Sequence, residues 1–303
     1  MSEASWSQYW QGREGDTTGA LTGVESDREL QEHWARVLSD GARDAAFLDL
    51  ACGAGTVLKQ AAKLGYSNLT GLDISSEAVK VLQNDLPAAK TMTASASETG
   101  LPDATYDIIV SQFGLEYAGA QAALSEAARL TAPRGRIETV MHMAGGAIEA
   151  EVQGHADHCA ELLESGFIEK ASALFKGAYE NNTAKAQALM DDVMIARDRV
   201  SALIKPNKRS LAAHLINGTA QLWEKRSAYV LQDVTGWLNS MKSEIEAYKA
   251  RMDSMIAAAL SQEELQRCVS HLEEQGFSVN TAPLSLSGAQ AAWVLSAHRN
   301  IGT

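Results

Sequence analysis

Short apolar runs alternate with helical patterns between positions 47 and 143. The runs have the length of buried strands, and the segments between them carry apolar residues at helical spacing. This alternation is typical of βαβ units, in which right-handed helical crossovers join parallel strands. The predicted strands are Phe47–Leu50, Leu69–Leu72, Ala88–Thr93, Tyr106–Ser111 and Gly135–His142, with helices near 55–65, 76–85 and 119–131.

The pattern changes after residue 145. Positions 146–261 show long helical patterns rich in Ala, Glu, Leu, Lys and Met, with breaks at Asn181-Asn182 and Lys205-Pro206-Asn207. We interpret this stretch as an all-helical insertion.

Further elements are predicted on both sides of these segments. They are amphipathic helices at Glu25–Asp40 and Gln262–Gln275, and strands at Phe277–Leu286 and Ala291–His298. The last two strands, separated by Ser287-Gly288, are expected to pair as an antiparallel hairpin. The chain therefore predicts an α/β fold with a seven-stranded, mostly parallel sheet and a helical insertion between strands five and six.

Composition and charge disfavour some classes of binding partner. The chain has 303 residues, 46% of them hydrophobic, which is ordinary for a folded protein. Its net charge is −12, and its 26 basic residues form no visible stripe, so nucleic acid is not expected as a partner.

The cysteines and the N-terminus suggest a compartment. Cys52, Cys159 and Cys268 are odd in number and widely spaced, so they predict no disulfide framework. The N-terminal residues lack the apolar core of a signal peptide, and no stretch reaches the roughly 18 apolar residues that span a bilayer. We expect a cytoplasmic protein with no membrane partner.

The segment FLDLACGAGTVL, residues 47–58, is the most informative one. A strand runs into a loop of small residues, where Ala51, Gly53 and Gly55 allow a ligand to approach the backbone and the following helix N-terminus. Asp49 at the strand end favours a ligand with an ammonium group and disfavours a pyrophosphate. A dinucleotide is therefore disfavoured at this loop.

Two later segments add ligand-binding groups. LTGLDIS, residues 69–75, ends a strand in Asp73, whose carboxylate can accept hydrogen bonds from both hydroxyls of a ribose. In residues 93–117 another strand ends in polar and aromatic residues, at the edge where open α/β sheets bind ligands.

Together these segments resemble the motifs of class I methyltransferases, the Rossmann-like enzymes that use S-adenosylmethionine. The resemblance covers about residues 45–143 and the closing strands. The family's first motif is an acidic residue followed by small residues at alternate positions, matched here by Asp49, Ala51, Gly53 and Gly55, with alanine in place of the usual first glycine. It implies that Asp73 binds the ribose and that Ile74 lies on the adenine. Ser95, Ala96 and Ser97 fall where the family has an Asp-Ala pair that reads adenine, and Ser95 replaces the aspartate.

The residues that follow strands four and five are candidates for the acceptor side. Gln112 and Phe113 are expected to touch the methionine part of the cofactor, and Glu116, Tyr117 and His142 are candidate bases. Near the N-terminus, Trp6, Tyr9 and Trp10 form either a packed helix or an aromatic lid that would attract a sulfonium. We place Tyr9 and Trp10 among the cofactor-binding residues.

Three other readings remain open. HADHC, residues 155–159, has a spacing that could ligate a metal, but no further ligand is identifiable, so no metal site is predicted. Cys52 lies in the loop without an adjacent base, which favours a packing role over a nucleophilic one. A nicotinamide-dependent oxidoreductase and a non-catalytic S-adenosylmethionine-binding regulator are the alternative functions.

The expected function is in-line transfer of a methyl group from S-adenosylmethionine to an N, O or S atom of a small-molecule acceptor. Residues 1–40 are expected to form an N-terminal helical lid, and 41–145 with 262–303 the cofactor-binding domain. Residues 146–261 are expected to form a cap over the acceptor or an interface for a homodimer.

Overall fold

The computed structural model describes residues 6–7, 10, 24–180, 183–204 and 211–300. The chain divides into two compact units. The sheet unit comprises Met1–Val152 and Ser254–Thr303, and the helical unit comprises Gln153–Asp253. The boundaries between them fall inside two long helices, α6 (Ala147–Glu164) and α10 (Leu231–Ala258).

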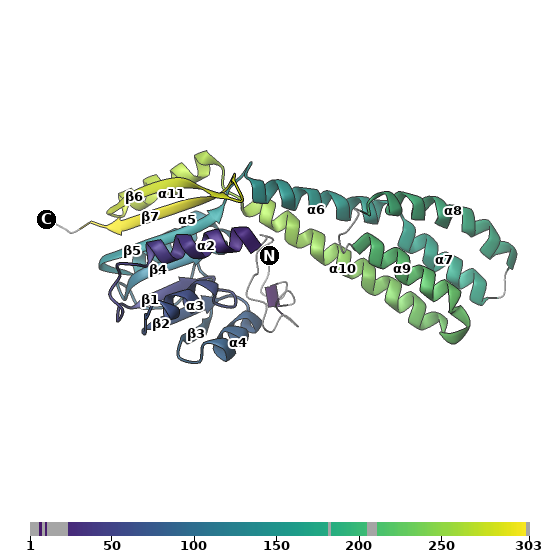
Figure 1. Cartoon of the computed structure of the whole chain (residues 1–303), viewed down its shortest axis with the longest axis horizontal. Coiled ribbons are helices and arrows are strands. Elements are labelled where there is room, and N and C mark those ends of the chain that lie inside the picture. Colours follow the sequence, from purple (N-terminus) through teal and green to yellow (C-terminus); the bar gives the residue numbers. More distant parts are fainter. Residues whose placement is uncertain (1–5, 8–9, 11–23, 181–182, 205–210, 301–303) are drawn as a thin grey trace. The chain divides into compact units, whose positions relative to one another are not determined.

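The sheet unit is built on one seven-stranded sheet with the order β3-β2-β1-β4-β5-β7-β6 (Figure 1). The strands are β1 (Phe47–Leu50), β2 (Leu69–Asp73), β3 (Lys90–Thr93), β4 (Tyr106–Gln112), β5 (Thr131–His142), β6 (Phe277–Leu286) and β7 (Ala289–Arg299). Strands β1 to β5 are parallel, and β7 pairs antiparallel with both β5 and β6. The predicted Rossmann-like, mostly parallel sheet is confirmed.

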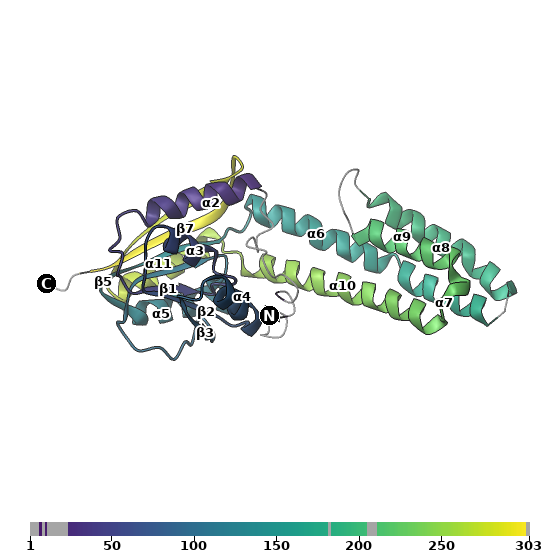
Figure 2. The ribbon, with the colours of Figure 1, turned by 60° about the horizontal axis from the view of Figure 1, so that its bottom comes forward.

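Helices cover both faces of this sheet (Figures 1 and 2). They are α2 (Val24–Val37), α3 (Thr56–Lys63), α4 (Ser76–Asp85), η1 (Leu115–Ala118), α5 (Ala120–Leu130) and α11 (Gln262–Glu274). On one face, side chains of α5 and α11 form a buried cluster with Leu48, Leu50 and Ile109 of the sheet. On the other face, α3 and α4 close over Gly71, where a side chain would collide with Leu58 and Leu82.

The predicted elements agree with the structure where the sequence carries strong signals. Strands β1 and β6 and helix α4 have the predicted bounds. The start predicted for β5, Gly135, is wrong, because the strand begins at Thr131. Thr131 pairs with Tyr106 across an irregularity in the ladder, and Arg134 has a positive φ of 70°, which hides the strand pattern in the sequence. The predicted breaks at Asn181-Asn182 and Lys205-Pro206-Asn207 lie outside the described residues.

The strand order reverses between β1 and β4. Successive crossovers lead from β1 to β2 and β3 on one side and to β4 and β5 on the other. At such a switch point the loops after the two central strands separate, and open α/β sheets bind ligands there. The glycine loop follows β1 and the predicted acceptor residues follow β4 and β5, so both candidate regions lie at this one edge of the sheet.

The helical unit has a hydrophobic core of its own. Besides parts of α6 and α10 it contains α7 (Phe167–Tyr179), α8 (Thr183–Ala202), α9 (Leu211–Glu224) and η2 (Arg226–Ala228). Phe175, Leu215, Leu238 and Ile245 are buried in this core, and Phe175 contacts Trp223 edge to face at 5.3 Å. These helices therefore bury their apolar faces against one another.

No helix within the described ranges combines the length and apolarity needed to cross a bilayer. The described residues also hold no group of three or more His, Cys, Asp or Glu side chains placed to bind a metal ion. This includes His155, His158 and Cys159 of α6.

Candidate functional site

The loop after β1 has a left-handed backbone at alternate positions. Ala51, Gly53 and Gly55 have φ values of 56°, 52° and 79°, and α3 begins at Thr56. Glycine adopts this conformation without strain, whereas alanine pays roughly 1 kcal/mol for it. The structure thus explains why the family has glycine where this chain has Ala51.

Two of these positions also lack room for a side chain. A Cβ on Gly53 would lie 2.9 Å from the indole of Trp10, and one on Gly55 would lie 2.4 Å from Leu82. Trp10 is buried and packs with Ala54, Ala78 and Val81 at this loop. The predicted residue Trp10 therefore lies against the loop, while Tyr9 lies outside the described residues.

Asp73 ends β2 and anchors the glycine loop. One carboxylate oxygen accepts the backbone N–H of Gly53 at 2.8 Å, and the other accepts that of Ser75, also at 2.8 Å. Burial raises the pKa of Asp73, although these backbone hydrogen bonds act in the opposite direction. A carboxylate has about four acceptor positions, so each oxygen can still accept one ribose hydroxyl. Ile74 follows and is half-buried.

Asp49 is a buried carboxylate without a hydrogen-bond partner. Asp49 is 1% exposed, and neither of its carboxylate oxygens is hydrogen-bonded within the described part of the chain. Burial raises its pKa well above the ordinary range, and the charge of Asp73 raises it further. A buried carboxylate destabilises the folded protein unless a cation or a hydrogen-bond donor lies beside it. The ammonium group of S-adenosylmethionine supplies both, so this site fits the cofactor that the loop predicts.

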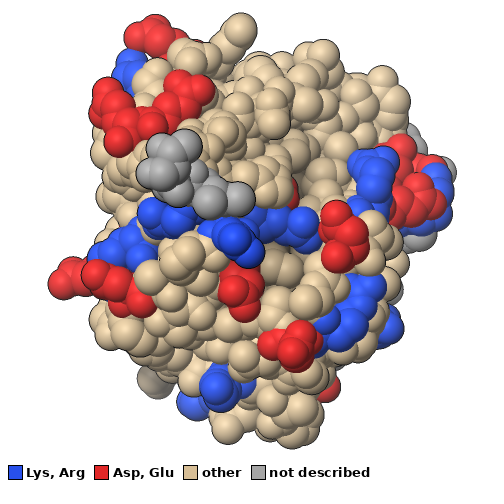
Figure 3. Space-filling model, turned by 90° about the vertical axis from the view of Figure 1, so that its left-hand side faces the viewer, with Lys and Arg blue, Asp and Glu red and all other residues tan. Residues whose placement is uncertain are grey.

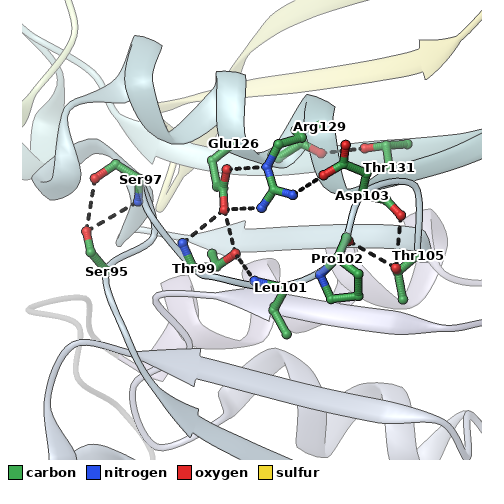
Figure 4. A network of polar contacts seen from close by, with 11 residues as sticks. Ser95, Ser97, Thr99, Leu101, Pro102, Asp103, Thr105, Glu126, Arg129 and Thr131 are labelled. Carbon is green, nitrogen blue, oxygen red and sulfur yellow. Dashed lines mark hydrogen bonds and ion pairs between the residues drawn. The ribbon is translucent and has the colours of Figure 1, made fainter.

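The segment after β3 is held by a polar network (Figure 4). The hydroxyls of Ser95 and Ser97 lie 3.0 Å apart, and Ala96 between them is buried. Further along, Glu126 of α5 accepts the backbone N–H of Thr99 at 2.9 Å and pairs with Arg129. The neighbouring Arg129 guanidinium lowers the pKa of Glu126 to about 2. The network fixes the loop that carries the predicted adenine-binding residues.

The end of β4 is tied to its neighbours by contacts that the sequence does not reveal. The Ser111 hydroxyl donates to the carbonyl of Leu50 at 2.7 Å and accepts the N–H of Leu115 at 3.2 Å. Gln112 accepts a hydrogen bond from the Trp34 indole of α2 at 2.6 Å. Ser111 and Trp34 were absent from the predicted site, and only the polar end of an apolar strand hints at Ser111.

The sequence did not identify Gly114 as a site residue either, and Gly114 packs directly against the glycine loop. A Cβ at this position would lie 2.6 Å from the Cβ of Ala51 and 2.7 Å from its carbonyl oxygen. The backbone after β4 therefore approaches the loop after β1 as closely as a glycine permits.

We expect Gly114→Ala to displace the glycine loop. The added methyl should cost about 1–3 kcal/mol of unfolding free energy and weaken S-adenosylmethionine binding, because the Ala51 backbone cannot yield without moving its neighbours. Urea unfolding and calorimetric titration would measure the two effects. Gly236→Ala on α10 is the control, since a Cβ there meets nothing within 4 Å. Equal stability of the two variants would contradict the expectation.

Glu116 and His142 form a buried pair. One Glu116 oxygen lies 2.7 Å from Nδ1 of His142 and accepts the backbone N–H of His142 at 3.0 Å. Each residue is 5% exposed, and the second Glu116 oxygen has no hydrogen-bond partner among the described residues. Two of the three predicted bases thus form one unit.

Aromatic rings surround this pair. The rings of Phe113 and Tyr117 lie 4.6 and 5.8 Å from the imidazole, and Trp6 meets Tyr117 edge to face at 5.0 Å. Phe113 has a left-handed φ of 52°, and its N–H donates to the carbonyl of Val140 on β5. The third predicted base, Tyr117, lies beside the other two.

Comparison with protein-family models identifies one part of the chain. The family model described as a methyltransferase domain matches residues 48–138, which span β1 to most of β5. Comparison with curated proteins finds no match.

Solved structures that are similar to this chain include methyltransferases. The plantazolicin methyltransferase BpumL, in complex with a pentazolic desmethylPZN analog and SAH, is 10% identical with a TM-score of 0.50, and the similarity covers 98% of this chain and 90% of that chain. A SAM-dependent methyltransferase from Aquifex aeolicus is 10% identical over 99% of this chain and 100% of that chain, with a TM-score of 0.44.

Other similarities cover a part of each chain. In the complex between the Haloferax volcanii Trm112 methyltransferase activator and a methyltransferase, the match is 21% identical with a TM-score of 0.37, and it covers 45% of this chain and 59% of that chain. The family model, the sheet order and the full-length similarity in fold agree with one another. Residues 48–138 thus match the methyltransferase-domain family, and they lie on a Rossmann-like α/β sheet.

Proposed function

We propose that this chain transfers a methyl group from S-adenosylmethionine to an N, O or S atom of a small-molecule acceptor. The observation that carries the proposal is the buried Asp49 carboxylate, which has no hydrogen-bond partner among the described residues and lies beside the glycine loop that Asp73 anchors. This arrangement suits a ligand with a ribose at one end and a cationic amino acid at the other.

Each predicted residue has a proposed task in holding the cofactor. Asp73 accepts the ribose hydroxyls and Asp49 faces the ammonium group, while the loop of Ala51, Gly53 and Gly55 lets the ligand approach the backbone. Ile74, Ser95, Ala96 and Ser97 are assigned to the adenine, and Gln112 and Phe113 to the methionine part. When bound, the cofactor supplies a methyl group on a positively charged sulfur. The residues of this chain then hold the acceptor in line with that methyl group and exclude water.

The distribution of charge bears on whether nucleic acid is the acceptor. The helical unit, Gln153–Asp253, has 13 basic and 13 acidic residues, so the whole net charge of −12 belongs to the sheet unit. On the face of the molecule in Figure 3, groups of Lys and Arg lie next to groups of Asp and Glu. A strongly acidic catalytic unit repels a phosphate backbone, which disfavours nucleic acid as the acceptor.

Calorimetric titration with S-adenosylmethionine and S-adenosylhomocysteine tests the proposal, with NADH and NADPH as controls. Micromolar binding of the two sulfur nucleotides alone is expected. Binding of the nicotinamides alone would favour an oxidoreductase. Binding of S-adenosylmethionine without turnover across a broad acceptor screen would favour a regulatory protein.

We propose that the N-terminal segment forms a lid over the cofactor. Trp10 lies against Gly53, the Ser7 hydroxyl lies 3.2 Å from that of Ser75, and Trp6 contacts Tyr117. These three contacts connect the segment to the cofactor loop, to the start of α4 and to the acceptor side. The assignment of 146–261 as an acceptor cap or homodimer interface is likewise a proposal.

Trp10→Ala is expected to weaken S-adenosylmethionine binding about tenfold, a loss of about 1.4 kcal/mol, chiefly through faster dissociation. The reason is that the glycine loop loses the indole that supports it. Trp10→Phe, which keeps an aromatic ring, should lose less. Stopped-flow dissociation of the cofactor would measure both variants, and wild-type rates for Trp10→Ala would contradict the lid.

A further inference from the structure

We propose that the acceptor is a flat aromatic compound bearing an ionisable hydroxyl, such as a phenol, and that Nε2 of His142 removes its proton while Glu116 holds the imidazole in place. This inference rests on the proposed methyl transfer and specifies its acceptor. It also assigns different tasks to the two buried residues: His142 is the catalytic base, and Glu116 is a positioning residue.

The hydrogen bonds of Glu116 define which imidazole nitrogen can act. An ionised carboxylate only accepts hydrogen bonds, so the 2.7 Å contact places the proton on Nδ1 of His142. The lone pair then lies on Nε2, which forms no hydrogen bond within the described part of the chain. The backbone N–H of His142 donates to the same Glu116 oxygen, so the carboxylate fixes both the tautomer and the position of the ring.

Burial strengthens the electrostatic interaction between Glu116 and His142. The side chains of His142 and Glu116 are 6% and 1% exposed. In a dry environment the negative charge of Glu116 stabilises the imidazolium that forms when Nε2 gains a proton. Among the described residues, the ring contacts of the imidazole on β4, η1 and β5 add only the Tyr117 phenol as a further titratable group. The pair is therefore arranged to receive one proton from a neutral acceptor.

The surrounding rings indicate the shape of that acceptor. Phe113, Tyr117 and Trp6 are each half-buried, and their ring contacts join them to His142 in one aromatic group. Aromatic side chains bind flat apolar molecules by offset or edge-to-face contacts worth about 0.5–1.5 kcal/mol each. An aromatic acceptor fits this group better than an aliphatic one.

The chemistry of the pair favours oxygen as the attacking atom. A phenol has a pKa of about 10 and is neutral at pH 7, so it needs a base as it reacts. A thiol, with a pKa of about 8.5, ionises more readily and has less need of a base. The carboxylate of Glu116 would hold an alkylamine in its protonated and unreactive form.

The proposed methyl transfer couples the loss of a proton to the formation of a carbon–oxygen bond. The hydroxyl proton moves to Nε2 of His142 while the acceptor oxygen forms a bond to the methyl carbon. The bond between that carbon and the sulfonium sulfur breaks, and its electron pair stays on the sulfur. The products are a methyl ether and neutral S-adenosylhomocysteine, and the positive charge resides on the imidazolium until the proton leaves to solvent.

Acceptors that share one ring system but differ in the attacking atom test which atom receives the methyl group. The full-length protein with S-adenosylmethionine would be given 2-naphthol, the alkylamine 2-(aminomethyl)naphthalene and 2-naphthalenethiol, together with phenol and 4-nitrophenol, and S-adenosylhomocysteine would be measured. Turnover of the hydroxyl compounds above the other two is expected. If only the amine or the thiol reacts, or if no phenol reacts although the cofactor binds, the inference is overturned and methyl transfer itself stands. Failure of the cofactor to bind would instead overturn the proposed function.

His142→Gln tests the role of the base. It should lower kcat for phenol by about 10²- to 10⁴-fold. The loss should be much smaller for 4-nitrophenol, which is largely ionised at pH 8 and needs no base. Glu116→Gln should lower kcat for phenol less than His142→Gln does, with KM little changed. His271→Gln on α11 is the control outside the site. Equal losses for the two phenols would indicate a structural role for His142 and overturn the assignment.

Discussion

Replacement of Asp73 by alanine is expected to weaken S-adenosylmethionine binding by about 100-fold or more, which corresponds to about 2.7 kcal/mol. The carboxylate holds the N–H groups of Gly53 and Ser75 and, in the proposed complex, both ribose hydroxyls. The alanine variant leaves all of these donors without their acceptor. Calorimetric titration of the purified variant measures the loss.

Two further variants separate binding from folding. Asp73→Asn keeps one carbonyl acceptor, so its loss should lie between those of wild type and Asp73→Ala. Asp85→Ala removes an exposed carboxylate on α4 that pairs with Lys59, and it should leave cofactor affinity unchanged. Wild-type affinity in Asp73→Ala would show that the ribose lies elsewhere.

Asp49→Asn should have two effects of opposite sign. It should raise the melting temperature of the cofactor-free protein at neutral pH and weaken S-adenosylmethionine binding by about tenfold or more. The folded protein keeps Asp49 buried without a partner, so its charged form is disfavoured there, whereas the bound ammonium requires that charge. Thermal unfolding and calorimetry on the same preparation test both effects. A variant that loses stability and affinity together would contradict this account.

The raised pKa of Asp49 makes both the stability of the fold and the affinity for the cofactor depend on pH. The pKa of Asp49 is raised on folding, so the group favours the folded state most at acidic pH, and this contribution declines as the pH rises above the ordinary carboxyl range towards the folded pKa. Cofactor binding favours the ionised form, so affinity should increase with pH across the same interval. Binding should release protons, measurable by calorimetry in buffers of different ionisation enthalpy, and Asp49→Asn should release fewer.

Much of the fold was predictable because its signals are local. Strand β1 is a short buried run, apolar except for Asp49, that ends at a glycine loop. Helix α4 follows the capping residue Ser75 and carries apolar residues at helical spacing. The start of β5 could not be predicted, because its first residues pair across an irregularity and include a left-handed Arg134. Such a strand departs from the regular pattern on which the prediction depends.

The candidate site was predictable residue by residue but not in its contacts. Asp49 and Asp73 were recognisable as acids at strand ends, and Glu116 and His142 as polar residues after β4 and β5. Their pairing depends on the register that places Gln112 opposite Val140, which brings the ends of the two strands together. The close approach of Gly114 to Ala51 joins segments more than 60 positions apart, and no local pattern encodes it.

The position of β7 between β5 and β6 has a consequence for protein synthesis. His142 at the end of β5 lies opposite Ala292 near the start of β7, with the whole helical unit between them in sequence. While the ribosome translates Gln153–Asp253, β5 is an open edge whose backbone groups have no partner on one side. The residues that complete the sheet beside the proposed base emerge only afterwards. The nascent chain therefore exposes that edge for as long as the helical unit takes to be made, and a chaperone that binds unpaired strands would find its target there.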